Sequence, residues 1–210
     1  MQHNTESAAD TAERLESGKI LPLVFKLTVP AVVAQLITFL YNIVDRMFVA
    51  KISGSGMDAL AALGIVLPIT LVIQAFTNLI GLGGAPRASI KLGENDKTEA
   101  DKIFNTSFVM LLVVGIIISI VTFCAARPLV VAFGCPETAV DFATSYLEIY
   151  AGGTVFVMLA QGLNPFITAQ GRSAVAMLSV LVGAAANIAL DPLFIFVFGL
   201  GVNGASLATV

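Results

Sequence analysis

Long apolar segments separated by short polar stretches make up nearly all of the chain after residue 20. Each complete segment exceeds the roughly 20 residues that a helix needs to cross a bilayer, and none alternates like a β-barrel strand. The pattern therefore predicts an all-α membrane protein, a multi-pass helical bundle. Its helices are expected at about 21–50, 59–84, 103–125, 139–163 and 174–198, with an incomplete sixth at 202–210.

Composition supports this assignment, because 57% of the 210 residues are hydrophobic and only 12% are charged. That balance is typical of membrane proteins and not of soluble domains. Without a large basic surface, we expect no nucleic-acid partner. Residues 1–19 are polar and lack the apolar core of a cleaved signal peptide. We predict a cytoplasmic tail at 1–19 and one transmembrane lobe at 20–210.

The distribution of Lys and Arg predicts the orientation in the cell membrane. Eight of these residues fall on one side and three on the other if the amino terminus is cytoplasmic, as the positive-inside rule requires. Residues 91–102 then form a charged cytoplasmic loop, 53–58 a short outer turn, and 126–141 an outer connection that holds a short helix. Because nine residues cannot span a membrane, we expect the run that ends at Val210 to belong to a longer protein.

Asp191 lies in one of the most apolar stretches, AAANIALDPLFIFVFGL. An ionised carboxylate is costly in hydrocarbon, so an intramembrane Asp indicates a functional site. Asn187 precedes Asp191 by one helical turn. Pro192 follows it, lacks an N–H and crowds the carbonyl of Ile188, which predicts a kink and a free backbone oxygen. These groups together are typical of a proton or small-cation site.

Other polar side chains are predicted at the same depth in the outer half of the membrane. At 1.5 Å per residue, Asp45 lies about 34 Å along the first helix and Asp191 about 28 Å along the fifth. Tyr146 and Thr209 lie about 12 and 10 Å from the outer ends of the fourth and sixth helices. Asn187 is one turn deeper than Asp191. The sequence thus predicts that polar groups from four helices converge.

A purely structural interpretation of these residues stands beside the functional one. Asp45 can pair with its neighbour Arg46, and Asn187 or Tyr146 can serve as interhelical hydrogen-bonding groups. Thr209 can bond its own helix backbone. Glu148, two residues from Tyr146, points to another helix face and is left out of the predicted site.

Three motifs carry a family resemblance: an Asp late in the first helix, N-x-x-x-D-P in the fifth, and G-A-x-x-A-T opening the sixth. They stand in LTVPAVVAQLITFLYNIVDRMFVAKI, in NIALDPLFIF and in LGVNGASLATV, and LGIVLPITLVIQAFTNLIGLGGAPRASIKLGEND matches through the second helix. Over nearly everything after residue 20, the chain resembles the amino-terminal half of MATE (multidrug and toxic compound extrusion) transporters.

The resemblance implies one six-helix lobe, its sixth helix truncated, of a two-lobe, twelve-helix transporter whose second lobe is missing here. It implies no enzyme, but a secondary active antiporter that exports lipophilic or cationic drugs in exchange for H⁺ or Na⁺, with no other cofactor. The positions that match the family's proton- or Na⁺-binding residues are Asp45, Asn187, Asp191 and Thr209, with Tyr146 as a neighbour and with helix kinks at Pro192 and Pro30.

Three alternatives remain at this stage. A flippase of related fold for lipid-linked precursors or polysaccharides would need cationic residues in its cavity, and the spans are nearly free of Lys and Arg. A truncated lobe without its partner can be inactive. An intramembrane aspartyl protease using Asp45 and Asp191 would resemble its relatives in a G-x-G-D motif, which the chain lacks. The sequence chooses neither the substrate nor between H⁺ and Na⁺.

Overall fold

The computed structural model describes residues 20–52 and 56–210, and these segments are helical with no strand. Within these segments, five helices are long and apolar enough to cross a membrane, so the predicted all-α multi-pass bundle is confirmed. The predicted tail at 1–19 lies outside the described residues. The elements are α2 Ile20–Ala50, α3 Gly56–Gly93, α4 Lys97–Cys124, α5 Ala126–Ala132, α6 Glu137–Ala169, α7 Ser173–Pro192, the π-helix η1 Leu193–Val197, and α8 Val202–Thr209.

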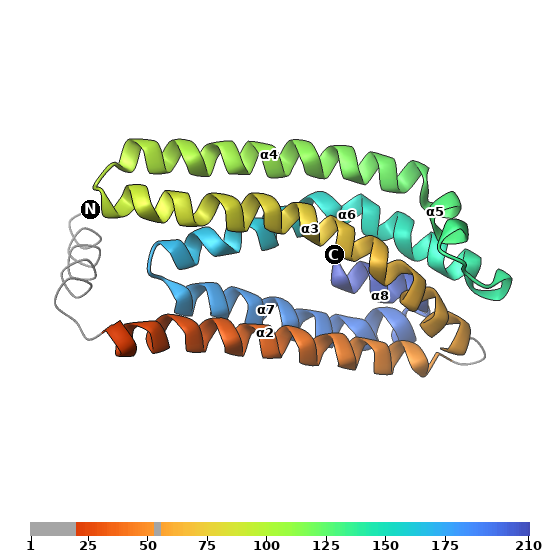
Figure 1. Ribbon diagram of the computed structural model, residues 1–210. Helices are drawn as coiled ribbons and strands as arrows, with labels where there is room; N and C mark the ends of the chain where they lie inside the picture. Colours follow the sequence, from red (N-terminus) through yellow and green to blue (C-terminus); the bar gives the residue numbers. More distant parts are fainter. Residues whose placement is uncertain (1–19, 53–55) are drawn as a thin grey trace.

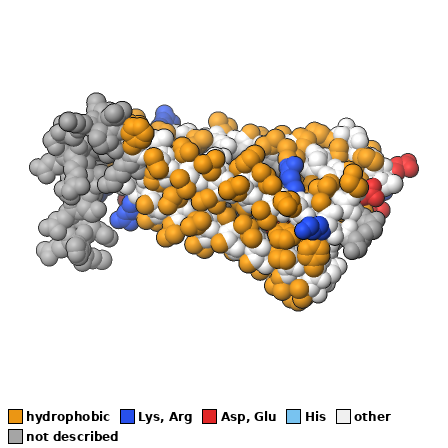
Figure 2. All heavy atoms as spheres, turned by 90° about the horizontal axis from the view of Figure 1, so that it is seen from below, with side chains coloured by type: hydrophobic (Ala, Val, Ile, Leu, Met, Phe, Trp, Pro, Cys, Tyr) orange, Lys and Arg blue, Asp and Glu red, His pale blue; other side chains and the backbone are white. Residues whose placement is uncertain are grey.

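Helix α6 is the centre of the bundle. It contacts α3 and α4 on one side and α7 and α8 on the other, while α2 packs mainly against α7 (Figure 1). Half of the residues in the most apolar stretch of α6 are buried, against only 6% for α2. Helix α2 therefore presents most of its apolar side chains outward. The surface seen in Figure 2 is largely hydrophobic, as expected for a surface that faces lipid.

Small residues set how closely α3 and α6 approach. Gly81 and Gly162 are both buried, and an added Cβ at Gly81 would stand 2.6 Å from the backbone oxygen of Gly162. At Gly162, an added Cβ would meet the side chain of Leu111 on α4 at 2.6 Å. Because the side chain of glycine is a single hydrogen atom, α3, α4 and α6 can pack closely together at these positions. Small residues commonly allow this kind of helix association in membranes.

The charged segment at 91–102 is not the loop that we predicted. Helix α3 continues to Gly93 and α4 begins at Lys97, so only residues 94–96 connect them. The charged residues on either side extend the helices beyond the apolar runs instead of forming a loop, because they can pair with one another along the helices.

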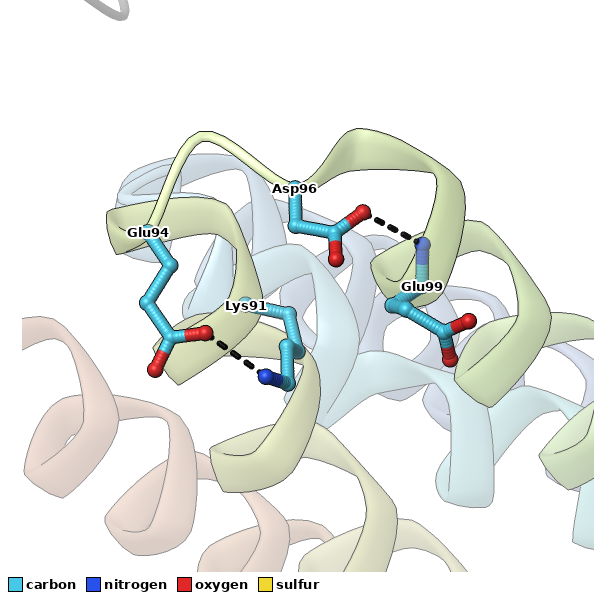
Figure 3. Close-up of polar contacts among 4 residues, drawn as sticks. All are labelled: Lys91, Glu94, Asp96 and Glu99. Carbon is cyan, nitrogen blue, oxygen red and sulfur yellow. Dashed lines mark hydrogen bonds and ion pairs between the residues drawn. The ribbon is translucent and has the colours of Figure 1, made fainter.

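Polar contacts hold this tight connection (Figure 3). The side chain of Asp96 caps α4 by accepting a hydrogen bond of 3.1 Å from the backbone N–H of Glu99, which satisfies a donor that helix geometry leaves free. Lys91 pairs with Glu94 at 2.6 Å. The capped end and the ion pair explain why the charged residues on either side of 94–96 remain helical.

At the opposite end of the bundle, the short helix predicted within 126–141 is present as α5. Arg127 on α5 pairs with Asp141 on α6 at 3.1 Å. The hydroxyl of Thr138 donates to Asp58 at 2.8 Å, which joins the beginnings of α6 and α3. The connection between α4 and α6 is thus fastened to the bundle.

Replacing Gly81 with Ala should destabilise the bundle, because the new methyl group meets backbone that cannot rotate away. Overpacking of this kind costs about 1–3 kcal/mol, so the midpoint of thermal unfolding in detergent should fall. Gly83→Ala is the matched control on the same helix, since a Cβ there has nothing within 4 Å. Equal midpoints for the two variants would contradict the close approach of α3 and α6.

Candidate functional site

The backbone changes its hydrogen-bonding pattern where Pro192 was expected to disturb it. Helix α7 ends at Pro192, and the next five residues form the π-helix η1. Proline cannot donate to the α-helical ladder, and a π-helical turn is a rare arrangement that recurs at functional sites. Pro30 also lies inside a helix, but α2 continues through it as α-helix.

Asp191 and Asn187 are buried and lack hydrogen-bonding partners. Asp191 is 0% exposed and Asn187 is 6% exposed. Neither oxygen of Asp191 and neither polar atom of the Asn187 amide has a partner among the described residues. An unpaired buried polar group is strongly unfavourable, and an unpaired carboxylate more so. Four such atoms on one helical turn therefore indicate a place for a ligand.

Asp45 reaches the same place from α2. It is 9% exposed, and its Oδ1 is also buried without a partner in the part of the chain that the structure describes. Because α2 packs against α7, Asp45 and Asp191 lie close enough to interact electrostatically. Arg46 is exposed and forms no ion pair with Asp45. The structural alternative, in which Arg46 neutralises Asp45 through an ion pair, is therefore not what the structure shows.

Tyr146 on α6 and Thr209 on α8 complete the predicted set. Tyr146 is buried, lies within electrostatic range of both carboxylates, and is within hydrogen-bonding reach of Thr209. The Thr209 hydroxyl donates its proton to the carbonyl of Ala205 at 2.9 Å, so its lone pairs stay available. The structure thus brings residues of α2, α6, α7 and α8 together, as the depth count predicted.

Two contacts fix α8, the helix that carries Thr209. The buried hydroxyl of Ser206 donates to the carbonyl of Tyr146 at 2.9 Å. At Gly204, an added Cβ would lie 2.7 Å from the backbone of Phe194 in η1, so only glycine allows this approach. Helix α8 is therefore seated directly on the π-helix that follows Asp191.

Sequence reasoning missed Tyr41, Tyr150 and Ser206. Tyr41 lies one turn before Asp45 and within electrostatic range of both carboxylates. Tyr150 stacks on Tyr146, with ring centroids 6.4 Å apart. The helical spacing from Asp45, Tyr146 and Thr209 was the available signal. The chain has three tyrosines and no tryptophan. All of its tyrosine fluorescence therefore comes from Tyr41, Tyr146 and Tyr150.

Two carboxylates, an amide and hydroxyl groups form a set of hard oxygen donors. Such donors coordinate small cations, including the Na⁺ of secondary transporters. The same two carboxylates can instead share one proton, because like charges close together in a low dielectric cannot both stay ionised at little cost. The unpartnered atoms fit either occupant.

Comparison with known proteins shows the family and the fold of this chain. The MatE family profile matches residues 30–193. The chain is 30% identical to the multidrug export protein MepA of Staphylococcus haemolyticus over 92% of this chain and 42% of that protein. Among solved structures, MATE in the straight conformation aligns with a TM-score of 0.85 at 28% identity, over 93% of this chain and 43% of its own.

MATE in the bent conformation aligns with a TM-score of 0.83 at 30% identity, over 91% of this chain and 42% of its own. The chain thus spans less than half the length of the relatives that it matches. The profile match nevertheless covers most of the chain, from the middle of α2 to η1. The chain therefore belongs to the MATE family, a family of multi-pass membrane transporters for multidrug efflux and not of enzymes.

Proposed function

We propose that this chain provides the cation-binding lobe of an antiporter that exports lipophilic or cationic small molecules in exchange for H⁺ or Na⁺. The observation that carries the proposal is the set of buried, unpartnered polar atoms on Asp45, Asn187 and Asp191. A protein gains nothing in stability from such atoms. A ligand that enters and leaves during transport accounts for them.

Repulsion between the carboxylates of Asp45 and Asp191 explains why the site should bind a cation. With both carboxylates ionised, their repulsion and the loss of hydration destabilise the empty site, so one proton or one Na⁺ is held strongly. When the cation leaves, the charge returns and the surrounding helices must readjust. An equilibrium between two conformations shifts only if the ligand prefers one of them, and the burial of the pair provides this preference.

The link from cation to conformation runs through Pro192. Asp191 is bonded directly to Pro192, η1 follows, and α8 packs on the backbone of η1 at Gly204. A change of charge at Asp191 therefore acts on a segment whose backbone bonding is already irregular. Relatives have been solved in straight and bent conformations, which supports helix bending as the motion that reshapes this lobe.

A cavity of about 510 Å³ lies away from the carboxylates and shares α2, α6 and α7 with their site. It is formed by α2, α3, α6 and α7, and its walls are small apolar side chains with uncharged polar groups such as Gln35, Thr38 and Asn164. A cavity of this size suits a drug-sized molecule. Its lining contains no Lys or Arg among the described residues, which favours lipophilic or cationic substrates over the pyrophosphate of a lipid-linked precursor.

The proposal assigns this chain one half of the transport pathway. The matched relatives are more than twice as long, and in our proposal their remaining length corresponds to an opposing lobe. Alternating access needs two bodies that move against each other around the binding site. Transport is therefore expected only when the lobe described here works with that second lobe.

Asp191→Asn in the complete transporter should abolish cation-driven export, because the amide can neither release a proton nor bind Na⁺ as a charge partner. Efflux of a fluorescent organic cation from membrane vesicles, with the pH and Na⁺ gradients imposed separately, measures this and identifies the coupling ion. Glu148→Gln removes a carboxylate of α6 outside the site and should leave export intact. Export at the normal rate by Asp191→Asn would refute the proposal.

Cation binding should be visible in the isolated chain through its tyrosines, since Tyr41 and Tyr146 lie within electrostatic range of both carboxylates and Tyr150 stacks on Tyr146. Titration with Na⁺ at fixed pH, and with acid in the absence of Na⁺, should change their fluorescence for the ion that binds. Ser206→Ala releases α8 from α6, and loss of a hydrogen bond worth about 1 kcal/mol predicts roughly fivefold weaker binding.

Ser119→Ala is the matched control for this measurement. The Ser119 hydroxyl also joins a neighbouring helix to α6, donating to the carbonyl of Ala151 at 2.6 Å, but no contact links it to the carboxylates. Its removal should leave the cation affinity unchanged. Equal weakening by the two variants would show that Ser206 acts only through general stability.

A further inference from the structure

We propose that the groove between the end of α3 and the beginning of α4 binds the phosphate group of an anionic phospholipid. The groove encloses about 370 Å³ and is lined by Arg87, Ile90, Lys91 and Ile103. It lies outside the carboxylate site and outside the large cavity, which has a different lining. This inference therefore goes beyond the proposed transport function and does not depend on it.

The groove is lined by two cationic side chains and two apolar ones. Arg87 and Lys91 are four residues apart on α3, so their side chains share one helix face. Ile90 on the same helix is largely exposed, and Ile103 faces it from α4. A guanidinium group binds phosphate oxygens through a planar fork, and an ammonium group adds a second charge. The phosphate group can bind to the two cationic side chains, and an acyl chain can pack against the two isoleucines.

The groove lies where α4 passes from charged to uncharged sequence. The last charged residue of this segment is Lys102, and the next is Arg127. Met110 and Ile117 follow Ile103 at intervals of seven residues, and both are exposed. Since residues seven apart lie on one helix face, an apolar stripe continues from the groove along α4. An acyl chain can follow this stripe while its headgroup stays at the groove.

The neighbouring acids leave Arg87 available. Glu94 pairs with Lys91, Asp96 caps α4 and Glu99 pairs with Lys102. Arg87 forms no ion pair with any described residue. The Lys91–Glu94 pair is open to water and is therefore weak, so Lys91 can exchange Glu94 for a lipid phosphate. A soluble anion would use the cations but not the apolar stripe.

Arg87→Gln with Lys91→Gln, made in the intact chain, tests this site. Native mass spectrometry of protein from vesicles of phosphatidylcholine with phosphatidylglycerol measures the retained anionic lipid. Roughly tenfold less phosphatidylglycerol should remain bound, because each basic residue adds attraction to anionic lipid. Lys97→Gln with Lys102→Gln removes the same charge near the groove, outside its lining, and should retain the lipid.

A charge-preserving variant and a competition with inorganic phosphate distinguish the possible results. Arg87→Lys keeps the charge and should retain most of the lipid, which separates loss of binding from loss of folding. Inorganic phosphate should not displace the lipid, because it cannot occupy the apolar stripe. Equal loss of phosphatidylglycerol from the two double variants would show that only the overall charge matters. Displacement of the lipid by inorganic phosphate would show a simple anion site. No loss from either double variant would show that the groove does not bind the lipid. Each of these results overturns the proposal.

Discussion

The burial of two carboxylates without protein partners is the constraint on which this structure depends. Neither Asp45 nor Asp191 has an ion-pair partner among the described residues, so the fold must keep both carboxylates away from lipid. Four helices share this task, because one or two would leave a carboxylate facing hydrocarbon. The site is thus a property of the assembled lobe and not of any single helix.

Close packing around α6 makes this enclosure possible. Gly81 and Gly162 bring α3 against α6, and Gly204 brings α8 against η1. Ser206 then joins α8 to α6 at the level of Tyr146. Residues with little or no side chain therefore determine where the polar ones stand. Loosening any of these contacts would admit lipid or water to the carboxylates.

The sequence revealed the residues that are chemically out of place. Asp45, Asn187 and Asp191 are polar inside apolar helices, so depth along the helices was enough to bring them together. Tyr41 was missed because tyrosine is common near membrane interfaces and attracts no notice there. The segment 91–102 was misread because its charges resemble a loop, although they pair along two helices. The π-helix after Pro192 was beyond prediction, since proline indicates an interruption but not how the freed backbone groups bond again.

The shallow burial of α2 has a consequence for biosynthesis. Only 6% of its apolar stretch is buried, and its main contact is α7, which is made after three further long helices. During translation, α2 enters the membrane with Asp45 before α7 exists. Until then the carboxylate has no enclosure, so it must be protonated or shielded by the insertion machinery. Enclosure of Asp45 therefore depends on a late pairing of α2 with α7.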